Sequence, residues 1–169
     1  GPVVFQDVDG VLNRYSRDLA SIDGPILDPL MVQRLGKVLR QHGASIVLSS
    51  EWRKHPEMLA FLEAGLHKSD PDLPQIVAMT PTKCEDVSCR AQELQAFLDA
   101  NPRLAESGRW VMVDDQNVAQ QSPQLLAGHF VKTNPFVGLT REGAESLGQL
   151  LLSANTRPST AVASAFLSA

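Results

Sequence analysis

Short apolar runs alternate along the chain with longer segments in which apolar residues recur every three or four positions. The runs predict strands, because a strand in a parallel sheet is buried on both faces. These strands lie over residues 3–7, 44–49, 110–113 and 128–132, with a short one over 75–78. The periodic segments predict helices over residues 29–41, 56–65, 87–100 and 141–152. Such an order is typical of an α/β protein whose parallel sheet lies between two layers of helices.

Length and composition predict one domain. The chain has 169 residues, of which 43% are hydrophobic and 20% charged, which is ordinary for a globular protein with a sizeable core. We expect this domain to span residues 3–152. Gly1-Pro2 resembles the remnant of a tag-removal site, and we expect the Ser- and Ala-rich residues 153–169 to form a disordered tail or linker.

The chain contains no apolar run of about 18 residues and no secretion signal, so we expect a soluble, cytoplasmic protein with no membrane partner. Cys84 and Cys89 have no second pair that would complete a zinc site. We expect both to be reduced thiols, and the alternative is a disulfide across the short loop between them, which would add little stability. The formal net charge of -4 neither indicates nor excludes a polyanionic substrate.

The first predicted strand runs directly into two aspartates, Asp7 and Asp9, and then into Gly10. Residues two apart in a strand point to the same side, so the two carboxylates would crowd each other unless the chain turns or a cation lies between them. Either arrangement makes a site. The alternative is a plain turn between two strands, which these residue types also favour.

Three further polar groups follow predicted strands or begin a helix. Ser49 and Ser50 end the second strand, where they would either bind a ligand or cap the next helix. Asp114-Asp115 ends the strand over 110–113, and a metal would relieve the repulsion between these adjacent acids. Two basic residues, Lys83 and Arg90, compete for the start of the helix over 87–100.

In their order along the chain, these four motifs resemble those of the haloacid dehalogenase (HAD) superfamily of phosphohydrolases. Three motifs are similar to those of the small HAD domains found alone or attached to RNA-repair enzymes. They are Asp-Val-Asp-Gly-Val-Leu-Asn at 7–13, Leu-Ser-Ser-x-Trp-Arg at 48–53 and Val-Asp-Asp at 113–115. The segment over 133–140 also resembles their closing segment. The resemblance covers residues 3–152 and implies a Rossmann-like three-layer α/β/α sandwich with a minimal cap.

The resemblance implies a Mg²⁺-dependent phosphatase in which Asp7 attacks phosphorus to form an aspartyl-phosphate and Asp9 is the general acid and base. Mg²⁺ would bind the Asp7 carboxylate, the Asp9 backbone carbonyl, and Asp114 or Asp115. The residues expected to bind the phosphate are Gly10, whose flexibility lets the chain bend, Ser49 with Ser50 as its substitute, and Arg90 in preference to Lys83. Arg53 would either contact the substrate phosphate or stabilise the loop. We expect Trp52 to be a packing residue rather than a platform on which a base stacks.

The connection from Asn13 to Leu27 is too short for a folded cap domain, which implies an open cleft and raises the expectation of a macromolecular substrate. Candidate substrates are a terminal phosphate of a nucleic acid, a phosphoprotein and a small phosphate ester. Two other classes of protein remain as alternatives. A receiver domain also gathers acids, a Ser or Thr and a basic residue around Mg²⁺, but with the motifs in the reverse order. A catalytically silent HAD-fold binding module would keep the fold without turnover.

Overall fold

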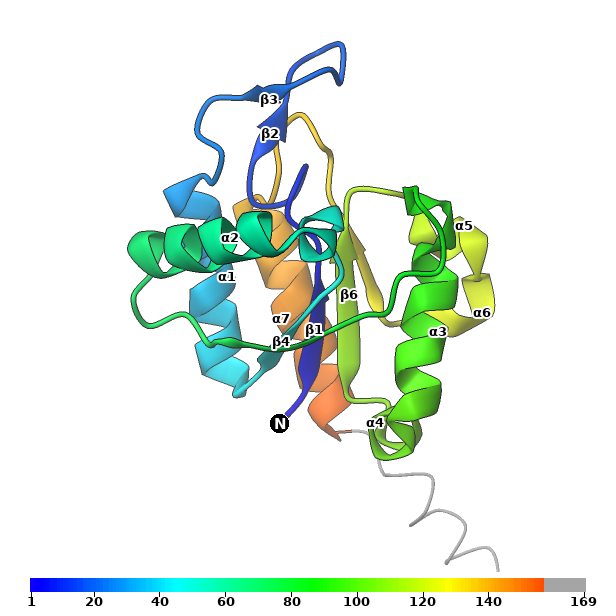
Figure 1. Cartoon of the computed structure of the whole chain (residues 1–169). Helices are drawn as coiled ribbons and strands as arrows, with labels where there is room; N and C mark the ends of the chain where they lie inside the picture. Colours follow the sequence, from blue (N-terminus) through cyan, green and yellow to red (C-terminus); the bar gives the residue numbers. More distant parts are fainter. Residues whose placement is uncertain (157–169) are drawn as a thin grey trace, which may run out of the picture.

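The computed structural model describes residues 1–156 (Figure 1). Its centre is a sheet of five parallel strands in the order β5-β4-β1-β6-β7. These strands are β1 (Val3–Gln6), β4 (Ser45–Leu48), β5 (Ile76–Met79), β6 (Trp110–Asp114) and β7 (Phe130–Lys132). The predicted α/β class with a central parallel sheet is confirmed, and each of the five predicted strands is present with bounds shifted by one or two residues.

The register of the sheet brings the ends of three strands together. Gln6, the last residue of β1, lies opposite Leu48 of β4 and Val113 of β6. The ladder continues past β1, because the Asp7 N–H donates to the Val113 carbonyl and the Ser49 N–H donates to the Gln6 carbonyl. All strands are parallel, so the residues that follow β1, β4 and β6 meet at one edge of the sheet.

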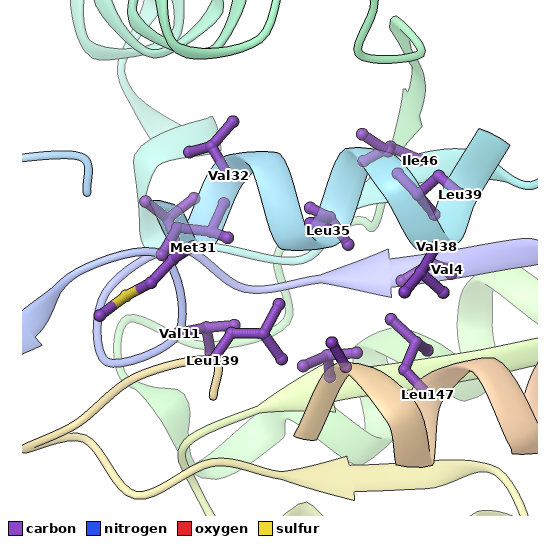
Figure 2. Close-up of a cluster of buried hydrophobic side chains, with 14 of the residues drawn as sticks. Val4, Val11, Met31, Val32, Leu35, Val38, Leu39, Ile46, Leu139 and Leu147 are labelled. Carbon is purple, nitrogen blue, oxygen red and sulfur yellow. The ribbon is translucent and has the colours of Figure 1, made fainter. Parts of the chain in front are cut away.

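Helices cover both faces of the sheet (Figure 1). They are α1 (Pro29–His42), α2 (Pro56–Ser69), α3 (Arg90–Ala100), α4 (Pro102–Ser107), α5 (Val118–Gln121), α6 (Pro123–Leu126) and α7 (Arg141–Thr156), with single 3-10 turns at η1 (Glu51–Lys54) and η2 (Val87–Cys89). Helices α1, α2 and α7 pack on one face, where Leu35 and Leu147 meet Val4 of β1 in a buried cluster (Figure 2). On the other face, α3 packs Leu94 and Leu98 against Phe5.

Helix α1 shows how local sequence sets an element. The Asp28 side chain accepts a hydrogen bond from the Leu30 N–H, Pro29 occupies the first turn, and Gly43 ends the helix at a positive φ of 60°. This arrangement is a standard N-cap followed by a left-handed C-terminal glycine. The helix predicted over 29–41 is therefore confirmed, with one more residue at its end.

Several short elements were not predicted. Helices α4, α5 and α6 have only four to six residues, too few to show a helical period in the sequence. The helix predicted over 87–100 divides into the turn η2 and helix α3. Of the predicted tail over 153–169, the first four residues continue helix α7, and the others lie outside the described residues. No helix in the described part of the chain has the length and apolarity that a bilayer span requires.

The connection from Asn13 to Leu27 contains a small hairpin, formed by β2 (Arg14–Tyr15) and β3 (Ile22–Asp23). It stands above the carboxyl edge of the sheet, beside the loop that follows β7 (Figure 1). A hydrogen bond from the Tyr15 N–H to the Pro135 carbonyl joins the two segments. The hairpin is the whole of the insertion at this position, so no folded cap domain stands there.

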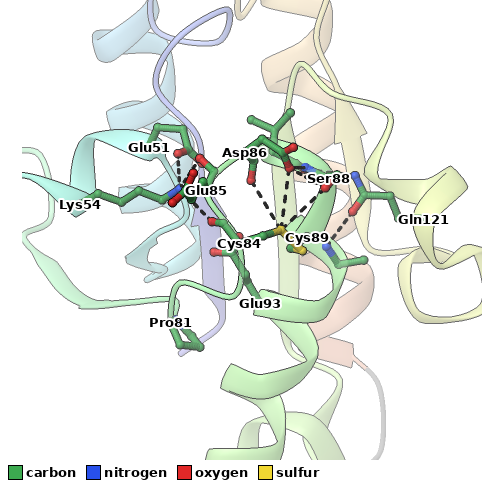
Figure 3. Close-up of a disulfide and its surroundings, with 12 residues drawn as sticks. Glu51, Lys54, Pro81, Cys84, Glu85, Asp86, Ser88, Cys89, Glu93 and Gln121 are labelled. Carbon is green, nitrogen blue, oxygen red and sulfur yellow. Dashed lines mark hydrogen bonds and ion pairs between the residues drawn. A yellow bond between two sulfur atoms is a disulfide. The ribbon is translucent and has the colours of Figure 1, made fainter.

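The expectation of reduced thiols is wrong in this structure, because Cys84 and Cys89 form a disulfide (Figure 3). The intervening loop turns tightly: the Asp86 side chain accepts a hydrogen bond from the Ser88 N–H and starts η2. This turn returns the chain so that the two Cα atoms are 6.0 Å apart, a separation that a disulfide spans. The linear spacing of the two cysteines did not reveal this turn.

Candidate functional site

Three carboxylates gather at the carboxyl edge of the sheet. Asp7 follows β1, Asp114 ends β6 and Asp115 follows it; all three are buried, and ligand oxygens of the three lie within 4.8 Å of one another. Carboxylate oxygens in this number and spacing fit a hard divalent cation such as Mg²⁺. The structure thus brings together three of the four residues predicted to bind metal through the sequence motifs.

The ionisation of this cluster is unfavourable without a cation. Burial, followed by the charge of Asp114, raises the pKa of Asp7 to about 7. Burial also raises the pKa of Asp114 to about 6, and burial and the neighbouring Asp7 charge raise the pKa of Asp115 to about 7. A bound cation would lower these pKa values because it stabilises the charged forms.

Arg90 is the basic residue that the fold places among these acids. It begins helix α3, and its side chain is 2% exposed. Its guanidinium hydrogen-bonds Asp114 and lies 3.4 Å from Asp7 Oδ1 and 3.6 Å from Glu51 Oε1. Burial would lower the pKa of Arg90, but the carboxylates of Asp7 and Asp114 outweigh it and raise this pKa. Lys83, the competing basic residue, is exposed on the preceding loop.

The two serines after β4 have different surroundings. The Ser50 hydroxyl accepts a hydrogen bond from the Trp52 N–H and caps the turn η1. Ser49 is fully buried, and its hydroxyl has no hydrogen-bond partner in the part of the chain that the structure describes. A buried hydroxyl without a partner is costly, so a ligand oxygen at this edge would satisfy it.

The contacts of Arg53 are those of a loop-stabilising residue, one of the two roles expected for it. Its guanidinium donates to the backbone carbonyls of Ser50, Thr80 and Pro81. It also forms a buried ion pair with Glu93 of α3. These contacts link the loop after β4 to the loop after β5 and to α3. Arg53 therefore stabilises the loop that carries Ser49 and Ser50.

Asp9 stands apart from the metal cluster. Its two carboxylate oxygens accept hydrogen bonds from two different donors, Asn13 Nδ2 at 2.8 Å and Trp52 Nε1 at 3.0 Å. Its carboxylate is not among the three that could hold an ion together. The side chain therefore points to another part of the site, and only its backbone carbonyl would be left for a metal, as the sequence predicts.

Gly10 lets the chain pass close to the cluster. Its φ is 79°, in the left-handed region that favours glycine, and an added Cβ would lie 2.5 Å from Asp115 Oδ2. Its carbonyl accepts a hydrogen bond from the Thr133 hydroxyl on the loop after β7. Any side chain at this position would clash with the Asp115 carboxylate.

Four residues near the site escaped the sequence analysis or were assigned another role there. Asn13 and Trp52 hold Asp9, and Glu51 faces Arg90. Tyr15, on the hairpin, lies in the field of the same acids. Burial, followed by the charges of Asp9 and Asp115, raises its pKa to about 12. The one sequence signal was the placing of Glu51 and Trp52 directly after the two serines.

Comparison with known proteins agrees with this geometry. Neither the curated proteins nor the solved structures contain a match to the chain. One family, described as the HAD domain in Swiss Army Knife RNA repair proteins, matches residues 3–144. This match covers the five strands, the acidic cluster and Arg90. The chain therefore belongs to the family of HAD domains found in Swiss Army Knife RNA repair proteins.

Proposed function

We propose that this domain is a Mg²⁺-dependent phosphatase that hydrolyses phosphate monoesters through an aspartyl-phosphate on Asp7. The observation that carries the proposal is the convergence of Asp7, Asp114 and Asp115 with one buried arginine, Arg90. A phosphate dianion approaches a carboxylate nucleophile only where positive charge offsets the repulsion. The HAD family membership supports the same chemistry.

When bound, Mg²⁺ would be held by the carboxylates of Asp7, Asp114 and Asp115 and the Asp9 carbonyl, and it would neutralise charge on the phosphate. Arg90 favours the ionised form of Asp7 and holds it in place through their 3.4 Å contact. The unpartnered Ser49 hydroxyl donates to a phosphoryl oxygen at the same edge.

In the first step an Asp7 oxygen forms a bond to phosphorus while the ester P–O bond breaks, and the leaving oxygen takes a proton from Asp9. In the second step Asp9 takes a proton from water, the resulting hydroxide attacks phosphorus, and the bond between phosphorus and Asp7 breaks. Phosphate leaves, Asp7 is again a carboxylate, and Asp9 is again the protonated acid with which the cycle began. Asp9 suits this role because its side chain lies outside the metal cluster.

The substrate we favour is a terminal phosphate of RNA. The family occurs in RNA repair proteins, and the insertion after β1 is a small hairpin that leaves room for a large substrate. A phosphoprotein and a small phosphate ester are the alternative substrates. A catalytically silent binding module is the alternative function, and it would bind metal without releasing phosphate.

The test is release of phosphate from p-nitrophenyl phosphate with Mg²⁺ and with chelator, for the parent protein and for Asp7→Asn. We expect activity that requires the metal and disappears in the variant. A 3′-phosphorylated RNA, a phosphopeptide and a sugar phosphate, compared by kcat/KM, then rank the substrate classes, with RNA expected first. Metal binding without turnover on any of these compounds would support the binding module instead.

A further inference from the structure

We propose that Trp52 is a positioning residue for proton transfer: its indole N–H, together with the Asn13 amide, fixes the Asp9 carboxylate at the point where the leaving oxygen needs a proton. This inference rests on the proposed function, because Asp9 has a catalytic task only if the domain cleaves phosphate esters. It goes further than that function by giving a role in the chemistry to a residue whose sequence context indicated packing alone.

The first support is the way Asp9 is held. Trp52 Nε1 donates to Asp9 Oδ2 at 3.0 Å, and Asn13 Nδ2 donates to Asp9 Oδ1 at 2.8 Å. Each carboxylate oxygen thus has its own donor, from segments on different sides of the site. Two such bonds fix both the position and the plane of a carboxylate, where a single bond would leave it free to rotate.

The Asn13 donor is itself held rigidly. Asn13 is fully buried, its Oδ1 accepts from the Gly10 N–H at 2.8 Å, and its Nδ2 also donates to the Ile26 carbonyl at 2.8 Å. The backbone N–H on one side and the carbonyl on the other determine which end of the amide is nitrogen. The amide therefore presents an N–H to Asp9 in a single orientation.

The Trp52 donor is equally constrained. Its backbone lies in the turn η1, where its N–H is bonded to the Ser50 hydroxyl, and its side chain is buried. The indole ring stacks on Phe61 of α2, with ring centroids 6.2 Å apart and an angle of 19° between planes. The serine cap and the ring stack together hold the indole in the position from which its N–H donates to Asp9.

This arrangement solves a problem that the acidic cluster creates. A fourth carboxylate two residues from Asp7 would readily turn inward and become another metal ligand, which would remove the group that donates the proton. The bonds from Trp52 and Asn13 draw the Asp9 side chain outward instead. The same sequence segment thus supplies a ligand at Asp7 and a proton carrier at Asp9.

The test compares phenyl phosphate, whose leaving oxygen needs a proton, with p-nitrophenyl phosphate, whose leaving oxygen needs it much less. We expect Trp52→Phe, which loses the indole N–H and keeps an aromatic ring, to lower kcat on phenyl phosphate by roughly tenfold more than on p-nitrophenyl phosphate. The matched control is Trp110→Phe, which makes the same change at a buried tryptophan of β6 whose ring packs on Phe5 and His129, and it should leave the ratio of the two rates unchanged. In an Asp9→Asn background, Trp52→Phe should not change that ratio further.

Equal losses on both substrates, or a further change of the ratio in the Asp9→Asn background, would overturn the inference. Hydrogen exchange of the Trp52 indole N–H, measured by NMR, tests the contact without any turnover. We expect this proton to be protected in the parent protein and to exchange faster in Asp9→Ala. A parent protein without phosphatase activity would overturn the proposed function, whereas an unprotected indole N–H in an active protein would overturn this inference alone.

Discussion

The guanidinium of Arg90 lies 3.4 Å from the carboxylate of Asp7, although Asp7 follows strand β1 near the start of the chain and Arg90 begins helix α3 beyond its midpoint. The same group hydrogen-bonds Asp114, so one buried cation faces two buried acids. This contact favours Arg90 over Lys83 as the basic residue of the site.

Arg90→Lys should lower kcat/KM roughly 10²-fold, because the lysine ammonium keeps a charge but cannot contact Asp7, Asp114 and a phosphate together. Arg90→Met should also destabilise the metal-free protein by about 3–5 kcal/mol at neutral pH, since it leaves buried acids unpaired. Steady-state kinetics and chemical unfolding measure the two effects. The matched control is Lys83→Ala; if it proved the more damaging change, Lys83 would take the role assigned to Arg90.

The acidic cluster predicts how stability depends on pH. Folding raises the pKa of Asp7 and Asp115 from 3.8 to about 7, so between these values the folded metal-free protein retains protons that the unfolded chain has lost. The free energy of unfolding should therefore fall as the pH rises through this window. Because protons compete with the cation for the same oxygens, the stabilisation by Mg²⁺ should grow over the same range.

Thermal unfolding with Mg²⁺ and with chelator, across that pH window, measures both trends. Asp115→Asn provides the control, because it removes one charge of the cluster and should flatten the pH dependence of the metal-free protein. A stabilisation by Mg²⁺ that stays constant with pH would show that the cation binds elsewhere.

Substitution of Ser50 should mainly lower stability, and substitution of Ser49 should mainly lower activity. Ser50→Ala removes the cap of η1 and should cost about 1 kcal/mol of stability. Ser49→Ala removes a buried hydroxyl without a partner among the described residues, so it should keep or raise stability while lowering kcat/KM roughly 10²-fold. Unfolding curves and kinetics on both variants test this contrast. The reverse pattern would assign the phosphate contact to Ser50.

The disulfide should stabilise the loop that leads into Arg90. A Cys84→Ser/Cys89→Ser double variant should lose about 2 kcal/mol, the loop-closure value for so short a ring. We expect kcat/KM to be largely retained, because Lys54 Nζ still donates to the carbonyls of Cys84 and Glu85 and so holds the loop (Figure 3). Thiol titration of the unreduced protein, followed by thermal unfolding with and without reductant, measures this. Free thiols in the unreduced protein would contradict the disulfide.

The sheet and most of the site were accessible from the sequence for a simple reason. Strands β1, β4 and β6 are apolar runs that stop at polar residues, and parallel strands bring those stops to one edge. Asp7, Ser49 and Asp114 therefore share one edge of the sheet, as the pattern of apolar and polar residues predicts. They are neighbours because β1 lies between β4 and β6 in the strand order.

The remainder depends on contacts that no local pattern encodes. The bond from Trp52 to Asp9 joins residues 43 positions apart, and its donor is fixed by a ring stack on α2. The hairpin has strands of two residues each, too short for an alternating pattern. The Cys84–Cys89 bond forms because η2 turns the loop back. Arg53 contacts Glu93 and three backbone carbonyls, partners that lie far from it in the sequence or that no local pattern indicates.

The most direct test of the proposed chemistry is the covalent intermediate itself. The parent protein and Asp9→Asn, which should slow the hydrolysis of the aspartyl-phosphate, are mixed with Mg²⁺ and p-nitrophenyl phosphate, quenched in acid and analysed by peptide mass spectrometry. We predict one phosphoryl group on Asp7, more abundant in Asp9→Asn and absent from Asp7→Asn. Release of phosphate by a protein whose Asp7 never carries that group would contradict the account.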